Sequence, residues 1–276
     1  MSGPAHRSGA RAALFVTMNV VGAAAFVWPF VLPALAGGDS SQRADGPWIL
    51  LLLTVALGAL LFTELGRGGL GPKTVALLGV LGAAVVALRL PGFVAGFSAL
   101  FIPVLIAGNA FGPGFGFVLG AVGMLASAVF LGGLGPWVPF QMVAVGWVGA
   151  GAGLMPRGSW RVRIGALAAY GFFVGYAYGA VMNLWAWPFV TDGSALAWDP
   201  SGGGGANLRR YAAFYGATSF AWDTFRALGN SILILVLGRP LLRTLDRAAR
   251  RMRLDLRPVD AGPPPKVPAQ AGREVI

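Results

Sequence analysis

Long apolar runs, separated by short polar connections, make up most of the chain between residues 12 and 237. A helix that crosses a hydrocarbon core about 30 Å thick needs about 20 residues, because each residue adds about 1.5 Å. Eight runs reach or approach that length: Ala12–Ala36, Pro47–Leu65, Lys73–Leu90, Phe93–Phe111, Gly114–Leu131, Val138–Met155, Ile164–Val190 and Tyr211–Leu237. The pattern predicts an all-α, polytopic membrane helix bundle of about eight spans.

Two clusters of glycine and proline interrupt these apolar runs, at Phe111–Phe117 and at Gly132–Met142. Backbone that leaves the helical form at membrane depth is tolerated where protein surrounds it or water reaches it. The fourth, fifth and sixth runs flank the clusters and are slightly short, so these helices could be bent or partly re-entrant. We expect short, shaped connections at both clusters and a functional role for residues beside them.

Composition excludes a soluble domain and most enzyme classes. Apolar residues make up 56% of the 276 and charged residues 11%, and the mean hydropathy is +0.70. The absence of cysteine excludes disulfides and thiolate chemistry, and the single histidine, His6, leaves almost no candidate for a histidine-based metal site. There is no P-loop and no Ser–His pairing. We therefore expect no catalytic residues, no metal and no cofactor.

The net charge of +11 comes mainly from basic residues in connections and in the C-terminal tail. If the N-terminus is cytoplasmic, sixteen basic residues lie on the cytoplasmic side and four on the outer side. Without the nine in the tail, the ratio is seven to four. Because basic residues favour the cytoplasmic side, this predicts a multi-pass protein of the cytoplasmic membrane with both termini inside, and not a nucleic-acid-binding protein.

Two polar segments connect or follow the spans. The outer connection Thr191–Arg210 contains Gly202–Gly205 and could equally be a lid over an external pocket or an idle linker. In the tail, Arg239–Arg257 is a basic, partly amphipathic helix candidate, and Pro258–Ile276 is expected to be disordered. The basic helix is more simply interpreted as an anchor on anionic lipid headgroups than as a docking helix for a partner.

Polar residues inside the last span are the first candidates for a ligand site. Asp223 and Arg226 are three residues apart and can pair on one helix face, which Ser219, Trp222 and Asn230 share by their spacing. A lone arginine at a helix centre costs roughly 2.5–3.5 kcal/mol, so a partner is expected. The pair could contact a ligand, or it could be self-satisfied and position helices.

The outer ends of other spans supply further candidates. Asn183 and Trp185 close the seventh span, Trp137 and Gln141 follow the second glycine–proline cluster, and Arg89 ends the third span. Unpaired backbone groups in such a turn, with Gln141 beside them, could bind a ligand. The alternatives are an aromatic belt for the tryptophans, an ordinary interfacial turn, and an anchoring role for Arg89.

Small residues form a strip on the third span, where Gly79, Ala83 and Ala87 recur at intervals of four. Such a strip allows another helix to approach closely, whether from the same chain or from another subunit.

The middle of the chain resembles a known family. The segments FIPVLIAGNAFGPGFGF at 101–117, GPWVPFQM at 135–142 and GWVGAGAGL at 146–154 are similar to the substrate-binding membrane subunit, or S component, of energy-coupling factor (ECF) transporters, which belong to the ABC transporters. The resemblance extends over about residues 73–238.

The resemblance implies a six-helix substrate-binding core at 73–238 that captures a vitamin or related micronutrient from outside. It also implies partners: a transmembrane coupling subunit (T component) and two cytoplasmic ATP-binding subunits, which supply the energy. In this family a small-residue motif on the first core helix contacts the coupling subunit, and Gly79, Ala83 and Ala87 occupy the matching helix here. The chain departs from the pattern by an additional N-terminal hairpin at 12–65, after a short cytoplasmic tail at 1–11, and this hairpin could obstruct or modify docking.

We therefore interpret the chain as an importer subunit without ATPase activity. Aromatic residues near the outer ends, with few charges, suit a flat or ring-bearing ligand, and a cobalamin-like ligand is possible. The alternatives are a self-contained secondary transporter of a small solute, or a membrane scaffold without transport activity.

Overall fold

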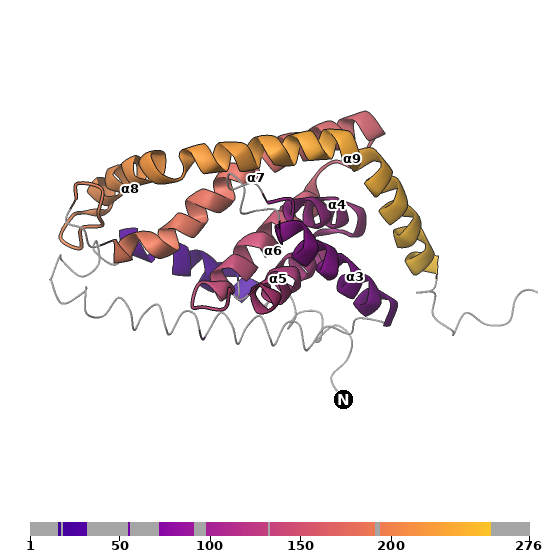
Figure 1. The fold of residues 1–276 in the computed structure, drawn as a ribbon, viewed down its shortest axis with the longest axis horizontal. Helices are drawn as coiled ribbons and strands as arrows, with labels where there is room; N and C mark the ends of the chain where they lie inside the picture. Colours follow the sequence, from indigo (N-terminus) through magenta and orange to yellow (C-terminus); the bar gives the residue numbers. More distant parts are fainter. Residues whose placement is uncertain are drawn as a thin grey trace, which may run out of the picture.

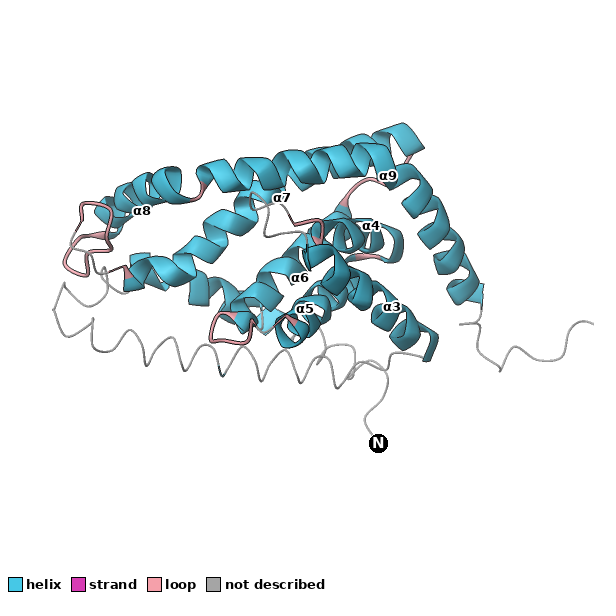
Figure 2. Ribbon diagram, in the orientation of Figure 1, coloured by secondary structure: helices cyan, strands magenta, loops and turns pink. Residues whose placement is uncertain are grey.

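The computed structural model describes residues 16–17, 19–31, 55, 72–90, 98–131, 133–190 and 194–254. These residues form helices and connections, with no strand among them (Figures 1 and 2). The helices are Asn19–Val31, α3 (Pro72–Arg89), α4 (Phe101–Phe111), α5 (Pro113–Phe130), α6 (Val138–Leu154), α7 (Trp160–Ala186), α8 (Gly204–Thr218) and α9 (Phe220–Leu254), with a short 3-10 helix η2 at Trp187–Phe189.

Four of the described helices are long and apolar enough to cross a membrane: Pro72–Arg89, Pro113–Phe130, Trp160–Phe189 and Phe220–Arg251. The helix Asn19–Val31, α4 and α6 are apolar but shorter. This confirms the predicted all-helical, polytopic bundle. The predicted span Pro47–Leu65, apart from Val55, and the two ends of the chain at 1–11 and 258–276 lie outside the described residues.

The predicted last span differs from the structure. The apolar run Tyr211–Leu237 is divided at Ser219 between α8 and α9, which lie end to end along the top of Figure 1. Ser219 leaves helical geometry, with φ −125° and ψ −23°, and its neighbour Thr218 turns its hydroxyl onto the Phe214 carbonyl at 2.8 Å. Side chains that bond to nearby backbone groups in this way compete with a straight helix.

Glycine lets α4, α5 and α6 pack backbone to backbone. At the predicted glycine–proline junction, Gly112 has φ +107°, and Pro113 begins α5 directly after it. Gly116 of α5 faces Gly149 of α6, and a Cβ on either glycine would overlap the other residue's carbonyl group. Small residues at such a crossing give van der Waals contact that larger side chains would prevent.

A second strip of small residues lies on α7, where Gly171, Gly175 and Gly179 recur at intervals of four and face α9. A Cβ at Gly175 would overlap the backbone of Ala227. The sequence analysis did not single out this strip, although its spacing is the same as that of the strip on α3. It holds α9 against α7 along much of the bundle.

The N-terminal helix Asn19–Val31 is integrated into the bundle. The Phe26 ring lies 5.3 Å from the ring of Phe140 and 5.7 Å from that of Trp147, both on α6. Asn19 Oδ1 accepts a hydrogen bond from Trp147 Nε1, and the Pro29 carbonyl accepts one from Trp198 Nε1 at 2.8 Å. The helix Asn19–Val31 therefore packs over the ends of α6 and α7.

The described part of the outer connection, 194–203, has a defined conformation. The fully buried amide of Asn207 donates to the carbonyls of Asp199 and Gly202 at 2.7 and 2.9 Å and accepts from the Asp199 N–H at 3.0 Å. Trp187 of η2 donates to the Leu196 carbonyl at 2.8 Å. This segment is thus tied to η2 and α8.

The predicted basic helix at Arg239–Arg257 is the continuation of α9 as far as Leu254. Pro240 lies inside α9, and Figure 1 shows α9 turning downward toward its end, beside α3. Leu242 is buried in the main core, and Leu245 packs against a cluster that contains Leu78 of α3. We call residues 241–254 the α9 arm.

Candidate ligand-binding site

Most of the sequence-predicted site residues lie at one end of the bundle, where α4, α6 and α9 begin and α3, α5 and α7 end. Trp137, just before α6, and Trp185, near the end of α7, come together there, with ring centres 5.8 Å apart. We call this the site end. The opposite end carries the α4–α5 and α6–α7 connections and the α9 arm.

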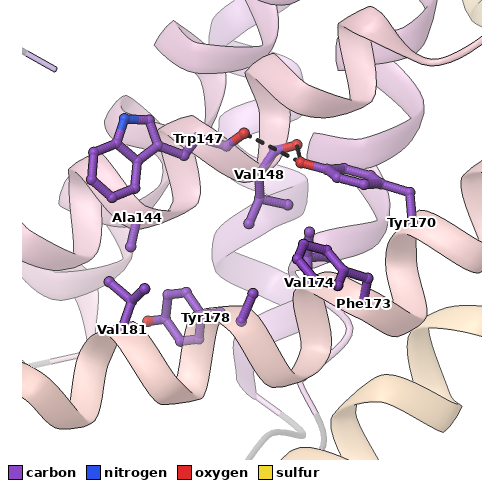
Figure 3. Close-up of a pocket in the computed structure, with 9 residues that line it drawn as sticks. Ala144, Trp147, Val148, Tyr170, Phe173, Val174, Tyr178 and Val181 are labelled. Carbon is purple, nitrogen blue, oxygen red and sulfur yellow. Dashed lines mark hydrogen bonds between the residues drawn. The ribbon is translucent and has the colours of Figure 1, made fainter. Parts of the chain in front are cut away.

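An apolar cavity of about 140 Å³ lies between α6 and α7 (Figure 3). The Tyr170 hydroxyl closes one part of it by donating toward the carbonyls of Trp147 and Val148, at 3.4 and 3.2 Å. Phe173 is 63% exposed, so the cavity reaches the outer surface of the bundle. The lining residues are Ala144, Trp147 and Val148 from α6 and Tyr170, Phe173, Val174, Ala177, Tyr178 and Val181 from α7.

Tyr178 connects this cavity to the ion pair of α9. Its ring lines the cavity and makes an edge contact with Phe101, at 5.0 Å between centres. The Arg226 guanidinium lies 5.3 Å from the centre of the same ring, in a cation–π arrangement. A positive charge from α9 therefore lies against a ring that lines the cavity.

Asp223 and Arg226 satisfy each other, as one of the two sequence hypotheses expected. Asp223 is 2% exposed, and it accepts hydrogen bonds from Arg226 and, at 2.8 Å, from the Tyr215 hydroxyl. Arg226 also donates to the Gly175 carbonyl at 3.2 Å. The carboxylate lies against Gly179, where a Cβ would overlap it. A buried pair bonded in this way joins α7, α8 and α9 and engages both oxygens of Asp223.

Three other predicted residues present buried polar atoms without a hydrogen-bond partner: Gln141 Oε1, Asn183 Nδ2 and Trp185 Nε1. Ser98 Oγ, just before α4, is a fourth such atom at the site end. Leaving a buried polar atom unpaired costs about 1–3 kcal/mol. Proteins rarely retain such atoms without a reason, and a ligand that supplies the missing partners is one.

The remaining predicted residues have other environments. Arg89 donates to Ser127 Oγ at 2.7 Å and to Met124 Sδ at 3.3 Å, so its guanidinium faces α5. Trp137 Nε1 donates to the Gly133 carbonyl at 3.1 Å. Trp222 is 51% exposed on the outside of α9, and the structure does not bring it to the cluster, because it is one residue away from the buried face that Asp223 marks.

Sequence reasoning missed three aromatic residues of this region: Phe26, Tyr178 and Tyr215. The signal for Tyr178 was present, because it shares a face of α7 with Val174, Val181 and Trp185 at helical spacing. Phe26 and Tyr215 reach the site only through tertiary contacts of the N-terminal helix and α8.

The strip on α3 faces outward. Gly79, Ala83 and Ala87 are exposed, while Leu78 and Val85 point into the bundle. A Cβ at Gly79 would meet no atom within 4 Å. This face of α3 is therefore flat and open within the described part of the chain.

A comparison with protein families matches residues 73–238, more than half of the chain, to the family described as "ECF transporter, substrate-specific component". No curated protein and no solved structure matches the chain.

Proposed function

The chain belongs to the family of substrate-specific components of ECF transporters, and we propose that it captures a vitamin or related micronutrient at the outer face of the cytoplasmic membrane. Members of this family are substrate-binding, non-catalytic subunits.

The observation that carries the proposal is the group of unpartnered buried polar atoms on Gln141, Asn183 and Trp185 at the site end. Two of these residues offer a hydrogen-bond donor, and Gln141 offers an acceptor. A few polar groups beside an apolar surface are typical of small-molecule sites, in which apolar contact gives affinity and the polar groups give orientation. Asp223 and Arg226 support this site from behind Tyr178, because their own hydrogen-bonding groups are engaged.

The size of the cavity favours a ring-bearing ligand. At about 140 Å³ it is close to an engineered apolar cavity of roughly 150 Å³ that holds benzene. Tyr178, Trp147 and Phe173 line it with aromatic surface. We expect one flat ring to occupy this space and its polar substituents to reach toward the site end. A cobalamin-like ligand is several times larger and would need most of its contacts elsewhere.

The distribution of charge supports capture from outside. Arg157, Arg161 and Arg163 lie in and after the α6–α7 connection, at the opposite end from the site, and the α9 arm adds further arginines there. Because basic residues favour the cytoplasmic side, the site end faces outward.

Energy would come from partner subunits: a transmembrane coupling subunit and two cytoplasmic ATP-binding subunits. The exposed small-residue face of α3 at Gly79, Ala83 and Ala87 is suited to close contact with a helix of the coupling subunit. The described N-terminal helix packs on α6 and is tied to Trp198 of the outer connection.

The proposal is tested by identifying and then displacing the bound molecule. Protein purified from its native membrane should retain a small ring-bearing compound that native mass spectrometry detects. Asn183→Ala and Gln141→Ala should weaken its binding at least tenfold, since each removes a buried hydrogen bond worth about 1.5 kcal/mol. Trp222→Ala, on the outer surface, is the matched control and should bind normally. Equal binding by all variants would refute the site.

A transport assay distinguishes this proposal from the main alternative, a self-contained secondary transporter. Proteoliposomes that hold this chain without ATP-binding subunits should bind the ligand but not accumulate it. Accumulation that an ionophore abolishes would instead assign the chain to self-contained secondary transporters.

A further inference from the structure

A polar cavity of about 240 Å³ lies at the end of the bundle opposite to the ligand site. Its lining comes from three places: Ala110 at the end of α4, Arg157 and Arg163 at the α6–α7 connection, and Asp246, Ala249 and Arg250 on the α9 arm. Nothing in the proposed capture of a ligand at the site end uses these residues.

The floor of this cavity is fully hydrogen-bonded and therefore preorganised. Arg163 donates through both terminal nitrogens to Asp246, at 2.6 and 2.9 Å, and through Nε to Asn109 Oδ1. Asn109 is fully buried, and its amide donates to the carbonyls of Ala152 and Met155, at 3.1 and 3.3 Å. These bonds fix the α9 arm to the ends of α4 and α6 and neutralise Asp246.

The two other arginines of the cavity are unpaired. Within the described part of the chain, neither Arg157 nor Arg250 donates a hydrogen bond or forms an ion pair. Arg157 extends over Gly112, with its Nη2 3.6 Å from the position that a Cβ would take there. Because the charges of Arg163 and Asp246 cancel, the lining carries two uncompensated positive charges, one from the α6–α7 connection and one from the α9 arm.

Neighbouring side chains place this cavity at a membrane surface. Trp160 is 48% exposed, and the guanidinium groups of Arg239 and Arg161 lie 4.3 and 5.4 Å from the centre of its ring. Leu154, just before the connection, is 73% exposed. A tryptophan covered by arginines, beside an exposed leucine, is the arrangement expected where lipid tails give way to headgroups.

We propose that this cavity binds a phosphate group, and that the occupant is the headgroup phosphate of an anionic phospholipid in the cytoplasmic leaflet. Guanidinium groups match phosphate oxygens with two parallel hydrogen bonds, and Arg157 and Arg250 can approach one phosphate from both sides. The exposed Leu154 would lie along the acyl chains. Assigning the leaflet rests on the orientation proposed above, whereas the phosphate site itself does not.

Native mass spectrometry of the full chain in a neutral detergent tests the site with phosphatidylglycerol as the probe. Arg157→Gln/Arg250→Gln should weaken phosphatidylglycerol binding about thirtyfold, at about 1 kcal/mol for each arginine. The matched control, Arg243→Gln/Arg247→Gln, removes two exposed charges from the same arm outside the cavity and should change binding less than threefold. Equal weakening in both double variants, or none in either, would overturn the proposal.

A second variant and a second probe test two simpler explanations: attraction by charge outside the cavity, and binding of free inorganic phosphate. Ala249→Leu fills the cavity without changing its charge and should weaken phosphatidylglycerol binding about tenfold while the protein keeps its melting temperature. Unchanged binding by this variant would show that charge outside the cavity is responsible. If inorganic phosphate alone stabilised the wild-type protein through Arg157 and Arg250 as strongly as the lipid does, the lipid assignment would be overturned. Neither result depends on the micronutrient site.

Discussion

Two asparagines in opposite environments allow a sharp test of the reasoning behind the ligand site. Asn183, near the end of α7, has a buried Nδ2 without a partner. Asn109, on α4, is fully buried and bonds to Ala152, Met155 and Arg163 through both ends of its amide. Substitution by leucine keeps a side chain of similar length in both places and removes every polar atom, so the two variants differ in what the protein loses.

The expected changes in the free energy of unfolding have opposite signs. Asn183→Leu in the ligand-free protein removes a desolvation penalty of about 1–3 kcal/mol and breaks no bond in the chain, so stability should rise by about 1–2 kcal/mol. Asn109→Leu breaks three hydrogen bonds, one of them to a charged group, and leaves Arg163 Nε and the Met155 carbonyl unpaired, which should cost about 3–5 kcal/mol.

Thermal unfolding in detergent, with and without the copurified ligand, is the assay. At about 2–4 °C for each kcal/mol in a chain of this size, the empty Asn183→Leu protein should melt several degrees higher than wild type and Asn109→Leu about 10 °C lower. Added ligand should stabilise wild type but not Asn183→Leu. If Asn183→Leu destabilised the empty protein, its amide would be satisfied within the fold, and the argument from unpartnered atoms would fail.

Three further outcomes follow from the structure. Asp223→Ala should cost about 3–5 kcal/mol of stability because it strands the buried cation of Arg226, and adding Arg226→Met should restore part of the loss; a double variant less stable than Asp223→Ala would contradict this pairing. Ala83→Leu on the exposed face of α3 should leave the melting temperature unchanged while reducing copurification with the coupling subunit, and undiminished copurification would remove α3 from the interface. The pKa of Asp199 is lowered by the Ser201 hydroxyl bond, so this turn is fully stabilised above the ordinary aspartate pKa of about 4 and loses that contribution as the pH falls through the lower value. The protection factors of the turn's amides, which are exchange rates corrected for the intrinsic effect of pH, should therefore fall in acid, and Asp199→Asn should show no such pH dependence.

The spans were predictable because apolarity is a local property of the chain. α5 and α6 begin and end within one residue of the predicted runs Gly114–Leu131 and Val138–Met155. The turn at Gly112 was also predictable, since glycine and proline terminate helices wherever they occur together. Ser219 was not, because its bend depends on a side-chain hydrogen bond within a run long enough to be predicted as a single span.

The sequence predicted which residues form the candidate site. The structure shows which of them have hydrogen-bond partners within the protein and which do not. Asp223 and Arg226 are engaged with each other, with Tyr215 and with α7, whereas Gln141 and Asn183 keep unpaired atoms. Nothing in the order of residues along the chain distinguishes these two cases. The difference lies in which helix packs beside each side chain.

Sequence by itself determined that this chain forms a helical membrane bundle and where most of its helices end. It also determined which few polar side chains lie within that bundle. These features are local, because hydropathy and helix termination act over a few residues. Tertiary structure decided that Trp222 faces outward, that the helix Asn19–Val31 covers α6 and α7, and that the α9 arm closes a cavity with Arg157. These outcomes depend on contacts between segments far apart in the chain, which glycine strips on α5, α6 and α7 permit by allowing backbones to meet.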